Sequence, residues 1–374
     1  MSPSRSRSLE PTRLAPVRAV AQLLHRPSGV RDTVEVVRRA AGIQAQDASA
    51  ARLGVRARAA RLSAGDVDRA RTDERSIVRT WAMRGTLHLL ATEDLAWQRT
   101  LFAERELEWS RRRLSEALGV DRRAQKRSVR LIERMLEKEG VVTRREVLDE
   151  LERAGIEFER QTAGHHLPRL VVLEGVACLG PDRGRDTTYV LTRDWIDDQP
   201  AVGRERALAE LASRYLAAFG PADESDMSAW SGLGLGECRA AFAAISSELA
   251  EVRVGPLRLA MLRRAALRAP RGRLVRLLPG FDNYFLGHAD RDFAVPPAEV
   301  ARVWPGGGII RPTVLVNGIA VATWSTNRSA ARNAITIDPF APIDDEARAA
   351  ITQEVEDVGR FEGLATKLTW ARGE

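Results

Sequence analysis

The sequence predicts an α+β protein, with a mainly helical first part and a β-rich, barrel-like region at the end of the chain. Between about residues 12 and 270, segments with helical spacing of apolar residues are followed by short alternating segments, and this order recurs three times. Helices followed by a strand hairpin indicate three tandem winged-helix units. Beyond residue 270, short apolar runs are separated by Gly and Pro, which is typical of strands.

The first winged-helix unit is expected at residues 12–120, after a disordered basic arm at residues 1–11 that is rich in Ser, Pro and Arg. Apolar spacing places its helices near residues 14–25, 31–41 and 64–72. Alternating residues then predict two strands within residues 76–90, with a break at Arg84. Side-chain alternation along the strand makes His88 either a cleft residue or a strand histidine whose hydrogen bonds are satisfied within the protein, and the second is the more common case.

The second winged-helix unit is expected at residues 121–200 and the third at residues 201–270. Thr143 and Glu146 have the spacing of a capping box, which predicts the start of a helix. A wing hairpin is expected within residues 177–191. The other helices of these units are predicted at residues 124–139, 162–174, 201–219, 223–230 and 235–246.

The β-rich region is expected at residues 271–374, with strands near residues 274–278, 309–316, 319–324 and 334–337. Asn317 and Gly318 form a strong signal for a two-residue turn, which predicts a hairpin around residues 309–324. We expect this hairpin to project from the protein, with Arg311 and Arg328 at or beyond its ends.

A polar segment at the end of a predicted helix is the best candidate for chemistry. Gly42 is expected just past the helix end, where glycine adopts a left-handed conformation without strain. If the following residues are extended, Gln44 and Gln46 point to one side while Ile43 and Ala45 point into the core. The sequence therefore predicts two neutral hydrogen-bonding groups that face one cavity.

Composition limits the kinds of partner and cofactor. The formal charge of +7 and the isoelectric point near 10.1 favour a polyanion such as nucleic acid. The two cysteines, Cys178 and Cys238, predict no disulfide scaffold and fit a reducing cytoplasm. They have no histidine at a zinc-ligand spacing, so we expect no metal and no cofactor. No stretch approaches the roughly 20 apolar residues of a membrane span.

Several stretches carry motifs of one family. They are Ala40-Ala-Gly-Ile-Gln-Ala-Gln-Asp-Ala-Ser-Ala-Ala-Arg-Leu-Gly-Val-Arg-Ala-Arg58, Thr80-Trp-Ala-Met-Arg-Gly-Thr-Leu-His-Leu-Leu90, Phe219-Gly-Pro-Ala222, Trp230-Ser-Gly-Leu233, Leu277-Leu-Pro-Gly-Phe-Asp-Asn-Tyr-Phe-Leu-Gly287 and Arg311-Pro-Thr-Val-Leu-Val-Asn-Gly318. They lie in order between about residues 40 and 325. Together they resemble the AlkZ/YcaQ-type winged-helix DNA glycosylases, and the Gln-Ala-Gln segment resembles the AlkZ-like branch.

The resemblance implies a bacterial, cytoplasmic DNA glycosylase that acts on double-stranded DNA with alkylated bases. Gln44 and Gln46 are then the expected catalytic residues, with Asp47 as a supporting electrostatic group. The hairpin near Asn317 is implicated in DNA binding. The predicted DNA contacts are therefore Arg84, His88, Arg311, Asn317 and Arg328, whereas Asp282, Asp290 and Arg291 are expected to hold loops together.

The chemistry of N7-alkylated purines suits a pair of carboxamides. Such a base already carries a positive charge and leaves as a neutral molecule, so no strong general acid is required. The enzyme then has to place a water molecule and stabilise charge on the sugar, which oriented carboxamides can do. The resemblance to the AlkZ-like branch implies that the substrates include bulky adducts and interstrand crosslinks formed by natural products, and that the role is alkylation repair or self-resistance.

Two alternatives remain at this stage. A bifunctional lyase needs a nucleophilic amine, and the three lysines, Lys126, Lys138 and Lys367, are far from the glutamines in sequence. A non-enzymatic winged-helix DNA-binding protein or transcriptional regulator is the competing class. Regulators usually dimerise to match paired half-sites, but the sequence has no heptad pattern. Three units in one chain favour a monomer.

Overall fold

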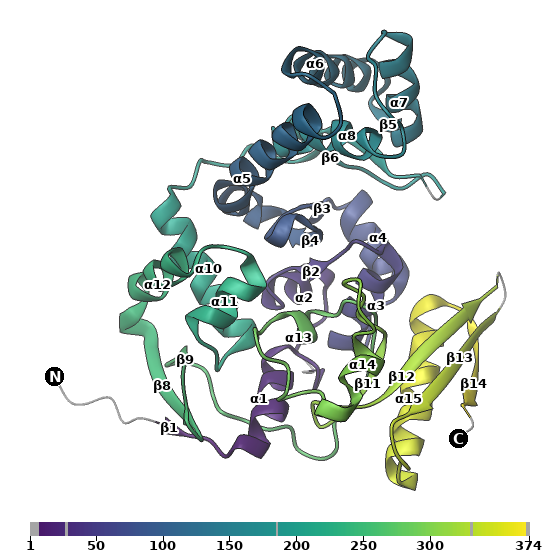
Figure 1. Cartoon of the computed structure of the whole chain (residues 1–374). Helices are drawn as coiled ribbons and strands as arrows, with labels where there is room; N and C mark the ends of the chain where they lie inside the picture. Colours follow the sequence, from purple (N-terminus) through teal and green to yellow (C-terminus); the bar gives the residue numbers. More distant parts are fainter. Residues whose placement is uncertain (1–6, 27–28, 185, 330–331, 372–374) are drawn as a thin grey trace. The chain divides into compact units, whose positions relative to one another are not determined.

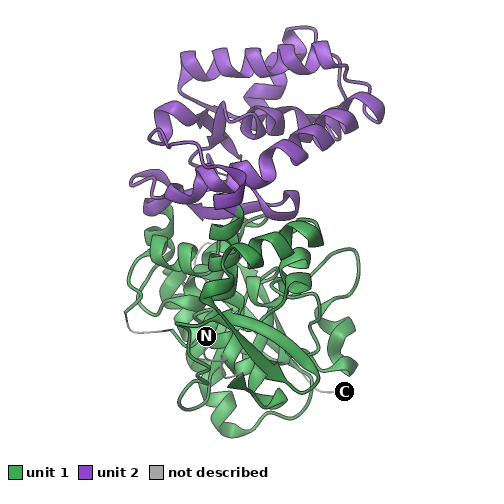
Figure 2. Cartoon of the chain, turned by 90° about the vertical axis from the view of Figure 1, so that its left-hand side faces the viewer, with its two compact units in different colours: residues 1–68, 208–374 green, residues 69–207 purple. Residues whose placement is uncertain are grey.

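The computed structural model describes residues 7–26, 29–184, 186–329 and 332–371, which fall into two compact units. Unit 1 combines residues 1–68 with residues 208–374, and unit 2 is the intervening stretch of residues 69–207 (Figure 2). The chain therefore leaves unit 1 once and returns once. The expected boundaries at residues 120, 200 and 270 divide the chain more finely, and they stay predictions.

The N-terminal part of unit 1 consists of short helices on either side of the glutamine segment. In order, its elements are α1 (Leu14–Ala21), α2 (Thr33–Arg39), β2 (Ile43–Gln44), α3 (Ala48–Arg58) and α4 (Ala64–Thr72), shown in Figure 1. α1, α2 and α4 lie where the sequence predicts helices. α3 was not predicted, although it begins directly after the glutamine segment.

Part of the arm that was expected to be disordered is ordered. Residues 1–6 lie outside the described residues, but β1 (Arg7–Ser8) pairs in parallel with β8 (Leu249–Val254). Leu9 is buried in an apolar cluster with residues of β8 and β9 (Leu257–Leu262). Burial of this side chain adds to the strand pairing and stabilises residues 7–9 against β8.

The stretch predicted as a third winged-helix unit has three helices and a hairpin. α10 (Arg204–Phe219), α11 (Glu224–Ser231) and α12 (Leu235–Ala244) precede a short 3₁₀ turn, Ser246–Glu248, and the antiparallel pair β8 and β9. Asp223 and Asp226 form a capping box that fixes the start of α11. The order agrees with the prediction.

The C-terminal region forms one five-stranded sheet that curls into a half-barrel. Its strands are β10 (Val275–Leu278), β11 (Thr313–Val316), β12 (Ile319–Arg328), β13 (Arg332–Pro339) and β14 (Ala365–Trp370), and they are neighbours in this order. All neighbours are antiparallel except β13 and β14. β10 and β14 are the two edges of the sheet, so the expected barrel-like region is open.

α15 (Asp345–Glu362) is the helical element of this region that the sequence analysis missed, and Figure 1 shows it beside the sheet. It contacts both edge strands, β10 and β14, and also α3. Ala347, Ile351, Val355 and Val358 form its buried side. The connection from β10 to β11 contains α13 (Asn283–Leu286), the 3₁₀ turn Pro297–Glu299 and α14 (Val300–Val303).

Unit 2 contains a sheet with strands in the order β4, β3, β6, β7, β5. The hairpin β3 (Ile77–Trp81) and β4 (Leu87–Ala91) is followed by the 3₁₀ turn Thr92–Asp94 and then α5 (Leu95–Glu116). The remaining elements are α6 (Arg122–Glu139), β5 (Val141–Thr143), α7 (Arg144–Arg153), α8 (Ala163–Leu173), β6 (Ala177–Leu179), β7 (Thr188–Leu191) and α9 (Thr192–Trp195).

The second expected winged-helix unit contains the predicted three helices followed by a hairpin, in that order. β5, between the first two helices, was not predicted, and it pairs with β7 of the hairpin. The predicted capping box is present, because Thr143 and Glu146 exchange hydrogen bonds between side chain and backbone. The identity of all three units as winged helices goes beyond this order of elements and stays a prediction.

The predicted turn at Asn317 and Gly318 is present but does not project. Both residues have positive φ, 52° and 84°, and they join β11 to β12. A Cβ on Gly318 would lie 2.7 Å from the backbone of Ala15 and 2.9 Å from the hydroxyl of Tyr284, so the turn is packed against α1. The strand residues that extend beyond β11 are instead 325–328 of β12, which pair with β13.

We expect Gly318→Ala to destabilise the protein more than Gly272→Ala does. Both glycines have positive φ, which costs a non-glycine residue about 1–3 kcal/mol, but a Cβ on Gly272 has nothing within 4 Å. Urea denaturation of the two variants measures the difference. Equal losses of unfolding free energy would mean that the turn does not pack tightly against α1.

Candidate active site

The glutamine segment has the alternation that the sequence predicts. Gly42 follows the end of α2 with φ of 89°, and its N–H donates to the carbonyl of Val37 at 2.8 Å. Ile43 and Ala45 are only 3% and 0% exposed, whereas Gln44 is half-buried and Gln46 is exposed. The core thus holds one side of the segment, and the glutamines lie on the other.

Asp47 caps the helix that follows the glutamines. Its Oδ1 accepts hydrogen bonds from the backbone N–H of Ser49 at 2.8 Å and of Ala50 at 3.0 Å. A carboxylate at this position also interacts favourably with the helix dipole. The structure therefore gives Asp47 a role in ending the extended segment, and the supporting catalytic role stays a prediction.

The carboxamide of Asn283, on α13, binds the backbone around Gln44. Its Oδ1 accepts from the N–H of Gln44 at 3.1 Å. Its Nδ2 donates to the carbonyl of Ala40 at 3.3 Å and to the carbonyl of Gly42. Sequence reasoning did not select Asn283, although it lies in a motif that carries the family resemblance.

Asp282, the neighbour of Asn283, holds α3 in a buried ion pair with Arg58, as expected of a residue that holds loops together. The two carboxylate oxygens accept from Nη1 and Nη2 of Arg58, each at 2.8 Å. The side chains of Arg58 and Asp282 are 0% and 1% exposed. Arg58 also donates to Oε1 of Gln22 at 2.7 Å. Asp282 in addition caps α13 through the N–H of Tyr284.

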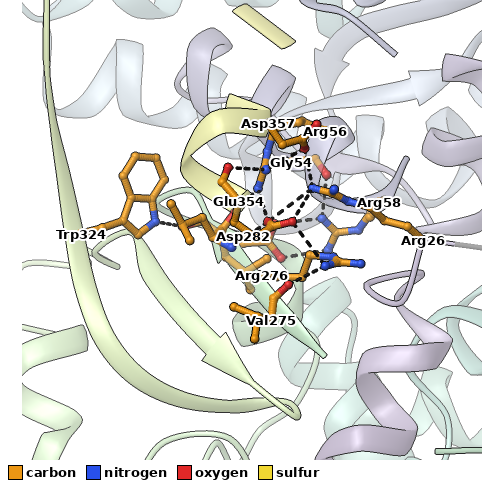
Figure 3. Close-up of polar contacts among 12 residues, drawn as sticks. Arg26, Gly54, Arg56, Arg58, Val275, Arg276, Asp282, Trp324, Glu354 and Asp357 are labelled. Carbon is orange, nitrogen blue, oxygen red and sulfur yellow. Dashed lines mark hydrogen bonds and ion pairs between the residues drawn. The ribbon is translucent and has the colours of Figure 1, made fainter. Parts of the chain in front are cut away.

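A second buried group of charges surrounds Arg56 of α3, near the ion pair of Arg58 and Asp282 (Figure 3). Arg56 contacts Glu354 at 3.1 Å and Asp357 at 3.0 Å, both on α15, and Arg26 and Arg276 pair with Glu354 as well. Burial raises the pKa of Glu354, but the arginines outweigh this effect and lower the pKa below its ordinary value. Glu354 is therefore ionised, and it fixes α15 to α3 and β10.

The two predicted DNA contacts in unit 2, Arg84 and His88, lie at the hairpin of β3 and β4. Arg84 has a positive φ of 55° in the turn, and the next carbonyl, that of Gly85, accepts from Arg169 at 3.4 Å. His88 is 1% exposed, and its Nδ1 lies 3.1 Å from the carbonyl oxygen of Thr86. Burial, and secondarily the charge of Arg84, lowers the pKa of His88 to about 3. His88 is thus a buried neutral histidine, which agrees with the more common of the two alternatives from the sequence and not with a position at a cleft.

The three predicted DNA contacts of the C-terminal region each bind another residue of this chain. Arg311 is exposed and donates to the carbonyl of Arg302 at 3.3 Å. Oδ1 of Asn317 accepts from the N–H of Leu274 at 2.9 Å. Arg328, at the end of β12, pairs with Glu362 at 3.1 Å and is still 47% exposed. Asn317 therefore has a structural role, and DNA binding by all three residues stays a prediction.

Neither a metal site nor a membrane-spanning helix is found among the described residues. Within the described ranges, no group of three or more His, Cys, Asp or Glu side chains is placed to hold a metal ion. Among the helices that the structure describes, none has both the length and the apolar character needed to cross a bilayer.

A family model, a curated relative and a solved structure together identify this chain as a DNA glycosylase. The chain belongs to the AlkZ-like DNA glycosylase family, whose model matches residues 37–361, a range that includes Gln44, Gln46 and Asn283. It is similar to the interstrand DNA cross-link repair glycosylase of Streptomyces sahachiroi, with 30% identity over 349 residues, 88% of this chain and 91% of that protein. The solved structure of S. sahachiroi DNA glycosylase AlkZ superimposes with a TM-score of 0.76 and 26% identity, covering 97% of this chain and 100% of that one.

We expect Asp282→Ala to lower the unfolding free energy by about 3–5 kcal/mol, because it leaves the Arg58 charge buried without its partner. The double variant Arg58→Met, Asp282→Leu should recover much of this loss, since it removes both charges. Chemical denaturation measures both. If the double variant is no more stable than Asp282→Ala, removal of the Arg58 charge recovers nothing and the prediction is wrong.

His88 predicts a pH dependence of stability. Its folded pKa is near 3 and the unfolded value is about 6.5, so the unfolded state binds a proton first as the pH falls. The wild type should therefore lose stability relative to His88→Asn, which keeps a hydrogen-bond donor, between pH 6.5 and 3. Thermal melting across this range tests the prediction, and parallel curves for the two proteins would contradict the buried neutral state.

Proposed function

We propose that this DNA glycosylase hydrolyses the N-glycosidic bond of N7-alkylated purines, with Gln44 and Gln46 as its catalytic residues. The observation that carries the proposal is the alternation of burial along residues 43–46, which leaves both carboxamides on the side away from the core. Asn283 binds the backbone of this segment, and Asp47 caps the helix that follows it. The glutamines are therefore held on a fixed backbone.

The reaction needs no proton donor from this segment. Alkylation at N7 gives the purine a positive charge, and breaking the glycosidic bond lets the base leave as a neutral molecule. Positive charge then develops on the sugar, where the carbonyl dipoles of carboxamides stabilise it and hold the attacking water. Because glutamine does not titrate, the activity of this pair should not follow a carboxylate pKa.

The name of the S. sahachiroi relative suggests which DNA lesions this chain acts on. The S. sahachiroi relative is named for repair of interstrand DNA cross-links. We extend cross-link repair to the present chain and propose that its substrates are bulky and crosslinked N7 adducts in double-stranded DNA. In this proposal the protein acts as a cytoplasmic monomer in alkylation repair or self-resistance. The winged-helix units and the residues Arg84, Arg311, Asn317 and Arg328 are proposed to contact the DNA, whereas His88, which is buried, does not. Membership in a glycosylase family supports the enzyme over the non-enzymatic regulator that the sequence left open.

We expect the double variant Gln44→Ala, Gln46→Ala to lose base release while it keeps duplex binding. Removing one such dipole typically lowers a rate by about 10²–10³-fold, so the pair should account for more. The measurement is single-turnover release of N7-methylguanine and of a bulky N7 adduct from a defined duplex. Duplex affinity is measured beside it, with Gln353→Ala, an exposed glutamine on α15, as the control.

Two outcomes would contradict the proposal. If the double variant loses duplex affinity in parallel with base release, the segment is structural rather than catalytic. If the wild type releases neither base, the substrate class is not N7-alkylated purines, and tight binding to one undamaged sequence would then favour a regulator.

A further inference from the structure

Asn283 satisfies several backbone groups around Gln44 at once. One end of its carboxamide accepts from the N–H of Gln44 at 3.1 Å, and the other donates to the carbonyls of Ala40 and Gly42. The residue is only 4% exposed. Both its donor and its acceptor are therefore used on the five-residue segment that leads from α2 to Gln44.

The backbone at this place needs such support. Ala41 and Gly42 both have positive φ, 58° and 89°, so the chain turns sharply away from the helix direction between α2 and β2. Positive φ is uncommon for a residue with a side chain such as Ala41 and carries a strain cost. The carbonyls on either side of Ala41 are those that Asn283 binds, so its carboxamide holds this turn in place.

Asn283 is itself held by its neighbour. Asp282 precedes it and forms the buried ion pair with Arg58, at 2.8 Å for both bonds. Arg58 lies on α3, which begins immediately after the glutamine segment. Residues 282 and 283 thus bind the chain on both sides of the glutamines: Asn283 binds residues 40–44, and Asp282 binds the end of α3.

We infer that Asn283 is a positioning residue of the glycosylase reaction, which sets the direction of the Gln44 side chain through the backbone. The inference rests on the proposed catalytic role of Gln44. A carboxamide is required at residue 283, since only this group donates to two carbonyls and accepts from an N–H. An aspartate of the same shape would place oxygen against the carbonyls of Ala40 and Gly42.

The experiment compares Asn283→Ala and Asn283→Asp in single-turnover release of N7-methylguanine from a defined duplex. A displacement of about 1 Å in a catalytic group can lower a rate by about 10²-fold, so we expect a loss of this size in both variants. Duplex affinity should change by less than about threefold, because phosphate contacts elsewhere supply most of it.

Two controls separate positioning from general destabilisation. Gln125→Ala removes a buried carboxamide in unit 2 that likewise donates to backbone carbonyls, those of Arg111 and Val120. It should lower the melting temperature and keep the release rate. The second control introduces Asn283→Ala into Gln44→Ala. If Asn283 acts through Gln44, the second substitution should lower the remaining rate by less than about threefold rather than by 10²-fold.

The outcomes are distinguishable. Folded Asn283 variants that release the base at the wild-type rate would overturn the inference, as would a loss that adds in full to that of Gln44→Ala. If Asn283→Ala does not fold, as judged by circular dichroism, the isosteric Asn283→Asp decides alone. If Gln44→Ala, Gln46→Ala releases the base normally, the proposed function itself is wrong, whatever the Asn283 variants do.

Discussion

The burial of two arginine charges on α3 is the constraint around which unit 1 is organised. Arg56 and Arg58 are both 0% exposed, and an unpaired guanidinium in such a place would be strongly destabilising. Residues two apart on a helix point about 200° from each other, so the two side chains reach different partners. Arg56 binds α15 and the carbonyl of Leu277, and Arg58 binds Asp282 and Gln22. One helix thereby connects segments that are hundreds of residues apart.

Local signals in the sequence predicted much of the fold, for identifiable reasons. The capping box of Thr143 and Glu146 and the left-handed turn at Gly42 can be recognised from neighbouring residues alone, and both are present. α3 was missed because its buried side carries Arg56 and Arg58, where the helical pattern calls for apolar residues. α15 carries a regular apolar spacing from Ala347 to Val358, so a closer reading of that spacing could have found it.

In the candidate site, too, local features could be predicted and long-range contacts could not. Alternation along the chain is enough to place Gln44 and Gln46 on one side of the segment. Asn283 is 239 residues away from Gln44, and no local pattern connects the two. At the turn of Asn317 and Gly318, the sequence predicted the local structure correctly but not its surroundings. The type of the turn follows from two residues, but whether it projects depends on Ala15 and Tyr284, which pack against Gly318.

The discontinuity of unit 1 has a consequence for biosynthesis. Residues 69–207 form a continuous unit, which can fold as soon as it has emerged from the ribosome. The glutamine segment is translated before that unit, yet the residues that hold it, Asp282 and Asn283, follow long after. Glu354, which pairs with Arg56, comes near the end. Most of the chain must therefore be synthesised before the backbone of Gln44 and Gln46 can be fixed, and an incomplete nascent protein carries these two glutamines without the residues that hold their segment.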